Sequence, residues 1–180
     1  MKKIPTALVR DPDDRAHVLM TVSPGCEWVF AGEGRATRKY DGTCVMFDGA
    51  DWWARREVKP GKTPPPGYVP AETDPVTGKT VGWEPVEQSA FVKFWREAVQ
   101  RRLPFHPGTY ELCGPKVNGD PEGFGSHVLV SHANAEHAPA LNAFSQPREI
   151  ANAVAGLHWE GVVWRHPDGR MAKLKRRDIA

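Results

Sequence analysis

The chain has 180 residues, of which 40% are hydrophobic and seven are tryptophan, so it can form one domain with a packed core, and general disorder is disfavoured. The formal net charge of +2 is too small to suggest a protein held to nucleic acid by bulk charge. No stretch approaches the length of a membrane span, and the start, Met1-Lys2-Lys3-Ile4-Pro5, lacks the apolar run of a signal peptide.

The first half of the chain predicts a β-hairpin followed by a long loop. Residues 35–47 are predicted to form a strand, in which Val45 and Phe47 alternate with Cys44 and Met46. Asp48-Gly49 is a strong hairpin signal, and residues 52–56 are predicted to be the return strand. The proline- and glycine-rich segment 59–85 is predicted to be an irregular insertion loop within the domain.

The register of this hairpin decides which arginine shares a face with Lys39. A two-residue turn pairs Asp41 with Arg56 and places Arg56 on the face of Lys39. A three-residue loop places Arg55 there instead. Both arginines therefore stay open as site residues at this point.

The second half predicts further strands and two helices. The spacing of apolar and capping residues predicts helices over 89–102 and 147–155, strands over 108–113 and 127–132, and a final hairpin of 160–165 with 170–176. Together with the first hairpin, these elements predict an α+β fold of two packed, mostly antiparallel sheets with flanking helices.

The three cysteines, Cys26, Cys44 and Cys113, lie far apart in the sequence. Because there is no Cys-x-x-Cys, neither a zinc site nor a disulfide framework is indicated, and reduced thiols in a cytoplasm fit best.

Lys39 is the candidate nucleophile. A free lysine amine has a pKa near 10.4 and is a poor nucleophile while protonated, but nearby cations or burial lower that pKa. Lys173, Lys175 and an arginine of the return strand could do this, and could also neutralise the charge of a phosphate under attack. The alternative for Lys39 is a solvent-facing lysine at a strand start, and the alternative for the basic residues near the end of the chain is a solvated charged tail.

Glu160 is the candidate metal ligand, since a hard cation that bridges phosphate oxygens prefers carboxylates. A two- or four-residue loop around Asp168 places Glu160 on the same face as Lys173 and Lys175, whereas a three-residue loop splits them. The alternative role of Glu160 is an ion pair with Arg176 or another surface charge.

Two further residues are candidates for holding a nucleotide. Glu111 could accept hydrogen bonds from ribose hydroxyls, or be a plain edge-strand carboxylate. His127, His132 and His137 lie five residues apart, which matches neither strand nor helix spacing for a metal site. His132, at a predicted strand end, could stack on a base, or be an ordinary surface or core histidine.

The ordered motifs resemble those of the covalent nucleotidyltransferase superfamily, which contains ATP-dependent DNA and RNA ligases and messenger-RNA capping enzymes. The motifs are Lys39-Tyr40-Asp41-Gly42, Glu111-Leu112-Cys113-Gly114, Glu160-Gly161-Val162-Val163 and Lys173-Leu174-Lys175. Further motifs are similar to the vertebrate-type 5′-to-3′ RNA ligase branch. They are Lys39–Cys44, Trp53-Ala54-Arg55, Gly82–Glu87, Asn118–Gly123 and Glu160–Trp164 with Asp168-Gly169.

This resemblance implies a role for each candidate residue. Lys39 takes AMP from ATP, Arg55 or its rival Arg56 contacts phosphate or ribose, and Glu111 reads the ribose. Glu160 serves Mg²⁺ or Mn²⁺. Lys173 and Lys175 hold the α-phosphate.

The resemblance also implies the reaction and the architecture. AMP passes from the lysine to an RNA 5′-phosphate, and an RNA 3′-hydroxyl then displaces it, as expected of a cytoplasmic RNA-repair ligase. Residues 1–180 are expected to form a single minimal nucleotidyltransferase domain with no appended oligonucleotide-binding-fold domain. The alternatives are a DNA nick ligase or other polynucleotide nucleotidyltransferase, and a non-catalytic RNA-binding module on the same fold.

Overall fold

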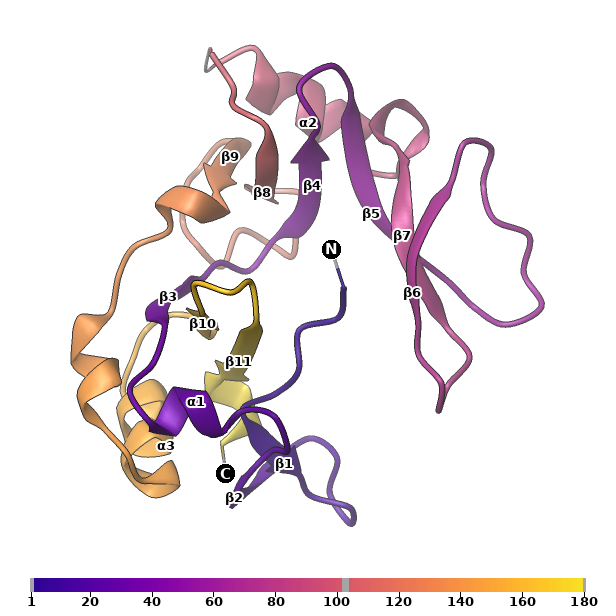
Figure 1. Ribbon diagram of the computed structural model, residues 1–180. Helices are drawn as coiled ribbons and strands as arrows, with labels where there is room; N and C mark the ends of the chain where they lie inside the picture. Colours follow the sequence, from indigo (N-terminus) through magenta and orange to yellow (C-terminus); the bar gives the residue numbers. More distant parts are fainter. Residues whose placement is uncertain (1, 102–103, 180) are drawn as a thin grey trace. The chain divides into compact units, whose positions relative to one another are not determined.

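The computed structural model describes residues 2–101 and 104–179 (Figure 1). The fold is α+β, with mostly antiparallel sheets and few helices, as the sequence predicts. The chain divides into two compact units. The middle unit comprises residues 41–134 with the first three residues, and the split unit comprises residues 4–40 and 135–180.

The split unit is built on a three-stranded antiparallel sheet of order β11-β10-β3. Its strands and helices are β1 (Leu8–Arg10), β2 (Val18–Val22), α1 (Glu27–Phe30), β3 (Arg35–Lys39), α3 (Pro147–Ala155), β10 (Gly161–Arg165) and β11 (Met171–Lys175). β1 and β2 pair with each other in a separate two-stranded sheet. Short 3-10 helices lie at Pro139–Ala143 and Arg176–Asp178. The predicted helix over 147–155 is confirmed.

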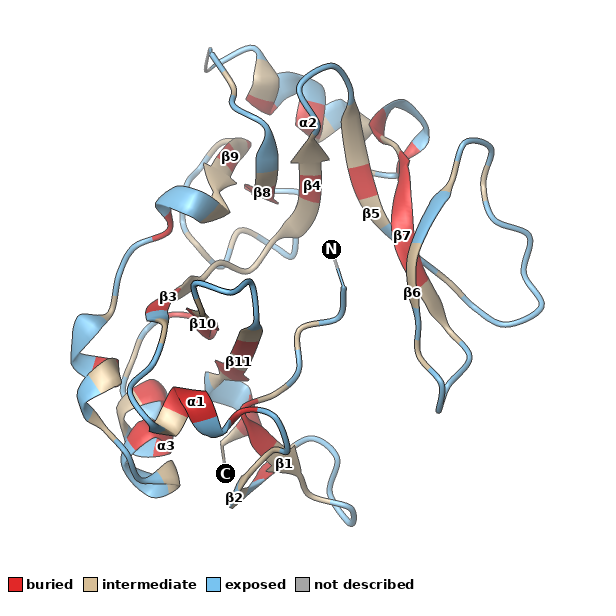
Figure 2. Ribbon diagram, in the orientation of Figure 1, coloured by how far each residue is buried: buried red, intermediate tan, exposed pale blue. Residues whose placement is uncertain are grey.

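Alternating side chains of the three-stranded sheet form the core of the split unit. Trp164 of β10 and Leu174 of β11 are fully buried against Ile150 and Val154 of α3. Figure 2 shows buried stretches in red along α3 and β11. Because side chains alternate along a strand, the residues between these core positions lie on the opposite face of the sheet. Lys39 lies on that opposite face, because its partner on β10 is Gly161, which alternates with the core residue Val162.

The middle unit is built on a six-stranded antiparallel sheet of order β6-β7-β5-β4-β8-β9. Its strands and helix are β4 (Thr43–Phe47), β5 (Trp52–Val58), β6 (Val69–Thr73), β7 (Thr80–Pro85), α2 (Val92–Val99), β8 (Gly108–Cys113) and β9 (Val128–Ser131), with 3-10 turns at Val86–Gln88 and His132–Asn134. One face of the sheet packs Val45 and Leu112 against Trp95 and Ala98 of α2.

The prediction of one continuous strand over 35–47 is wrong. Residues 35–39 form β3 of the split unit, and residues 43–47 form β4 of the middle unit. The unit boundary falls between Tyr40 and Asp41, inside the Lys39–Gly42 motif. The alternation noted in this segment covers only residues 44–47, which belong to β4, so it carried no information about the break after β3.

The predicted two-residue turn at Asp48-Gly49 is also wrong. Phe47 pairs with Trp52, so the loop of the β4–β5 hairpin has the four residues 48–51. The Asp48 carboxylate accepts hydrogen bonds from the backbone N–H groups of Ala50 and Asp51, both at 2.8 Å, and stabilises this longer loop.

Two other predicted boundaries need correction. The segment 59–85 is not irregular throughout, because it contains the β6–β7 hairpin. The helix predicted over 89–102 is shorter and spans Val92–Val99, and Arg102 lies outside the described residues. The predicted strands over 108–113 and 127–132 correspond to β8 and β9. Within the described part of the chain, none of the helices has the length and hydrophobicity needed to cross a membrane.

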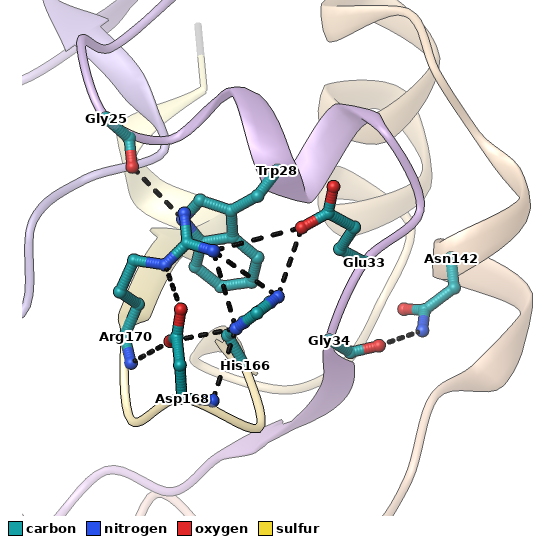
Figure 3. A network of polar contacts seen from close by, with 8 residues as sticks. All are labelled: Gly25, Trp28, Glu33, Gly34, Asn142, His166, Asp168 and Arg170. Atoms are coloured by element: carbon teal, nitrogen blue, oxygen red, sulfur yellow. Dashed lines mark hydrogen bonds and ion pairs between the residues drawn. The ribbon is translucent and has the colours of Figure 1, made fainter.

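The β10–β11 hairpin closes with the three-residue loop Pro167–Gly169, since His166 N–H donates to the Arg170 carbonyl at 2.9 Å. Asp168 is bound by the backbone N–H of Arg170 at 2.9 Å and by its guanidinium at 2.7 Å (Figure 3). The backbone bond from Arg170 is the main reason that the pKa of Asp168 falls to about 2. His166 also contacts Glu33 at 3.1 Å, which ties the loop to the segment after α1.

Candidate active site

A row of three residues crosses the split unit's sheet. Gly161 of β10 pairs with Lys39 of β3 on one side and with Lys175 of β11 on the other. A Cβ atom on Gly161 would lie 2.3 Å from the Leu174 carbonyl oxygen, so only glycine fits at the centre of the row. The two lysine side chains therefore flank a position without a side chain and lie on the same face of the sheet.

Glu160 joins the two lysines. Its carboxylate forms one ion pair with Lys39 and another with Lys175. The side chains of Lys39, Lys175 and Glu160 are only 21%, 17% and 9% exposed. Two cations thus share one carboxylate in a largely buried setting, which leaves one net positive charge.

The prediction that a three-residue loop separates Glu160 from the two lysines is wrong. The hairpin has the three-residue loop that was expected to separate Glu160 from the lysines, yet the ion pairs form. Glu160 precedes β10 in an irregular segment, so the alternation of strand side chains does not apply to it. Its carbonyl still accepts a hydrogen bond from the Arg176 backbone at 2.9 Å.

The electrostatics of the cluster follow from these contacts. Burial by itself would raise the pKa of Glu160. The charge of Lys39 and the hydrogen bonds from Lys175 and Lys39 outweigh burial, so the pKa of Glu160 falls below its usual value. Glu160 is therefore ionised at neutral pH and offers a fixed negative charge to the two lysines.

Backbone contacts fix β11, which carries Lys173 and Lys175. The Lys175 N–H donates to buried Asp178 at 3.2 Å, and Asp178 is itself paired with Arg10 at 2.9 Å. The Lys173 N–H donates to Pro5 at 2.9 Å, while its register partner is Val163. Lys173 therefore lies on the same face of the sheet as Lys175, two residues along the strand.

A second group of candidate residues lies in the middle unit. Glu111 of β8 pairs directly with Cys44 of β4. The Glu111 carboxylate oxygen Oε2 lies 3.0 Å from His132 Nε2. The other ring nitrogen of His132, Nδ1, lies 2.9 Å from the Thr109 hydroxyl. Cys44 was not among the site residues predicted from the sequence. Cys44, Glu111 and His132 come from three different strand regions, so no short sequence motif connects them.

The remaining two histidines of the sequence trio are elsewhere. His127 lies 2.6 Å from the Glu97 carboxylate and stacks on Phe94. His137 belongs to the split unit, where its backbone bridges Thr37.

The strand register separates Arg55 from Arg56. Because Val45 pairs with Ala54, Arg56 lies on the face of Ala54 and Arg55 lies on the opposite face. Arg56 is 4.0 Å from buried Glu84. Arg55 shares the face of Glu111, and its Nε is buried with no hydrogen-bond partner among the described residues.

The Asp41-Gly42 segment is fixed against β8 of the middle unit. A Cβ atom on Gly42 would lie 2.3 Å from the Leu112 carbonyl oxygen, so the motif glycine permits close backbone approach. Asn118 donates to the Asp41 carboxylate at 2.8 Å, and the Asp41 N–H donates to Glu122 at 2.8 Å. Two motifs that are separate in sequence therefore contact each other.

Comparison with known proteins finds two similar sequences. RNA ligase 1 of Danio rerio is 36% identical over 78 residues, which cover 39% of this chain and 24% of the relative. RNA ligase 1 of Mus musculus is 27% identical over 175 residues, which cover 71% of this chain and 50% of the relative. The chain thus aligns with half or less of the length of each relative, and no protein-family model matches it. These similarities support a distant relationship to RNA ligases.

Proposed function

We propose that this protein is an ATP-dependent RNA ligase that works through an AMP group carried on Lys39. The observation that supports this most strongly is the pairing of Lys39 and Lys175 across Gly161, with Glu160 bound to both. This arrangement combines a candidate nucleophile with an adjacent cation in a largely buried place. The distant similarity to RNA ligase 1 supports RNA as the substrate.

In the proposed first step, the neutral Lys39 amine attacks the α-phosphorus of ATP. A nitrogen–phosphorus bond forms while the bond to pyrophosphate breaks, and the proton of the amine leaves to solvent or to a nearby base. Glu160 is a weak proton acceptor because its pKa is lowered, so we assign it the role of positioning Lys39. Lys175, with Lys173 on the same face, stabilises the charge of the phosphate.

Glu160 is also the residue that would hold Mg²⁺ or Mn²⁺. A carboxylate is the ligand type that these ions prefer, and they commonly bind one carboxylate together with phosphate oxygens and water. Both oxygens of Glu160 contact an ammonium group, so its carboxylate would have to release one lysine or bind the ion through water. The ion would supply charge neutralisation at the phosphates.

We assign nucleotide recognition to the middle unit. Glu111 accepts hydrogen bonds from ribose hydroxyls, Arg55 contacts phosphate or ribose, and His132 offers a ring for base stacking. The register favours Arg55 over Arg56 for this role, since Arg55 shares the face of Glu111. In the two later steps, AMP passes to an RNA 5′-phosphate and an RNA 3′-hydroxyl displaces it.

The test is incubation of the purified protein with α-³²P-labelled ATP and Mg²⁺, followed by denaturing electrophoresis. We expect label to remain on the wild type and to be lost from Lys39→Ala. Lys93→Ala, which changes an exposed lysine of α2, should retain it. A parallel incubation with GTP measures nucleotide preference, and nicked RNA and DNA duplexes then distinguish an RNA ligase from a DNA ligase.

The proposal fails if folded protein takes no label and mass spectrometry shows that it does not already carry AMP. A non-catalytic RNA-binding module would give that result while still binding RNA. Label that persists in Lys39→Ala would contradict the assignment of the nucleophile.

A further inference from the structure

We propose that Cys44, Glu111 and His132 form a binding site for a zinc ion on the middle unit's sheet. A sulfur, an oxygen and a nitrogen ligand atom from these side chains all lie within 4.8 Å of one another. The three residues come from β4, β8 and the end of β9, three neighbouring strands of one sheet. The proposed reaction does not use Cys44.

The strand register explains why the three ligand atoms converge. Cys44 and Glu111 are direct partners across the β4–β8 ladder, so their side chains leave the sheet side by side. Glu111 in turn pairs with Val130 of β9, and His132 follows two residues later. His132 Nε2 reaches the Glu111 carboxylate at 3.0 Å.

His132 is oriented as a metal-binding histidine usually is. Its Nδ1 lies 2.9 Å from the Thr109 hydroxyl, and this contact directs Nε2 toward Glu111. Metal-ligating histidines commonly use their second ring nitrogen for such a hydrogen bond, which fixes the ring and its tautomer. Thr109 is therefore a positioning residue in this proposal.

The set of donor atoms selects the kind of metal. Mg²⁺ and Ca²⁺ prefer oxygen ligands, whereas zinc accepts thiolate, imidazole and carboxylate together. Tetrahedral zinc requires ligand atoms about 3.3–3.8 Å apart. The observed spacing of up to 4.8 Å needs a contraction of about 1 Å, which small side-chain rotations could supply. Three protein ligands leave a fourth position for water.

Glu111 is the residue that links this site to the proposed function. If Glu111 holds the ribose, zinc and nucleotide compete for the same carboxylate, and zinc should inhibit labelling by ATP. This consequence rests on the proposed function, but the binding of zinc does not. Binding is therefore measured without ATP, so that the two proposals can fail independently.

The experiment uses metal-stripped, untagged full chain under reducing conditions, titrated with Co²⁺ as a coloured probe and then with Zn²⁺. We expect one equivalent of Co²⁺ to give a thiolate-to-cobalt absorption band, and Zn²⁺ to remove it. The band should be lost in Cys44→Ser and retained in Cys113→Ala, which changes a buried neighbouring thiol. Thr109→Ala should weaken binding about 10-fold.

A second measurement on the wild type does not depend on any variant folding. Zn²⁺ should slow alkylation of Cys44, located by peptide mass spectrometry, while Glu111→Gln should reduce that protection at least 10-fold. An absent cobalt–thiolate band in folded protein, a band that persists in Cys44→Ser, or unchanged alkylation of Cys44 with excess Zn²⁺ would overturn the proposal.

Discussion

Two glutamates, one in each unit, have side chains of almost the same low exposure but different partners. The side chain of Glu160 is 9% exposed and that of Glu111 is 11% exposed. Glu160 is bound by two lysines, whereas Glu111 contacts the imidazole of His132. A lysine offers three N–H donors on a compact ammonium group, whereas an imidazole presents two distinct ring nitrogens with fixed directions.

This difference separates two kinds of chemistry. An anion that holds two cations is suited to arranging positive charge around a phosphate. A carboxylate beside an imidazole is suited to directional recognition of hydroxyl groups or, as proposed above, of zinc. The split unit is thus expected to control the rate of the covalent step, and the middle unit the strength of nucleotide binding.

The largest expected effect is that of Glu160→Gln. The amide removes the negative charge that holds Lys39 and Lys175, so we expect the rate of ATP labelling to fall about 100-fold or more. Single-turnover labelling at saturating ATP measures this rate. Glu136→Gln is the matched control, because Glu136 pairs with Arg38 at the surface and is 54% exposed. Equal rates in both variants would contradict the role of Glu160.

In the middle unit, the largest effect is expected of the variant Arg55→Ala. If Arg55 contacts the nucleotide, the ATP concentration that gives half-maximal labelling should rise about 10-fold, with a smaller change in the maximal rate. Arg56→Ala should change that concentration less than about twofold, because Arg56 faces Glu84. The reverse order of the two variants would show that the register argument does not identify the site residue.

Gly42→Ala tests the backbone contact within the motif. The added methyl group would approach the Leu112 carbonyl and the Glu111 side chain, so we expect unfolding free energy to fall by about 1–3 kcal/mol. Urea denaturation measures the change. Gly156→Ala, with ordinary contact distances of 3.6 Å, should stay within about 0.5 kcal/mol of the wild type. Equal effects would mean that the close approach at Gly42 does not matter.

The smallest effect is expected at Asp168, at the far end of the β10–β11 hairpin. Its pKa is lowered to about 2 in the folded state, whereas an unfolded aspartate has a pKa of about 3.9. Its contribution to stability is therefore complete above the unfolded value and is lost as pH falls toward 2. Asp168→Asn should make stability less dependent on pH between about 5 and 2. Urea midpoints across this range measure it, and an unchanged slope would contradict the assignment.

The sequence predicted the α+β class, the helix over 147–155 and the strands corresponding to β8 and β9. It failed where side-chain contacts override local signals. Asp48 stabilises a longer turn through its own carboxylate, and Gly42 lies so close to the Leu112 carbonyl that a side chain would not fit there. Neither contact is visible in a hydrophobic pattern.

The candidate site, like the fold, was predicted from the sequence only in part. The order of the motifs selected Lys39, Glu160 and Lys175, and the structure brings these three side chains together. The choice between Arg55 and Arg56 required the strand register. Cys44 was missed because its neighbours on the sheet are distant in sequence.

The most direct test of the account is to locate the nucleotide on the protein. After incubation with ATP and Mg²⁺, the protein is digested under alkaline conditions, which preserve a phosphoramidate bond, and its peptides are analysed by mass spectrometry. We expect one AMP group on Lys39 and none on Lys175 or Lys173. AMP attached to another residue, or a fully unmodified protein that is folded and exposed to fresh ATP, would contradict it.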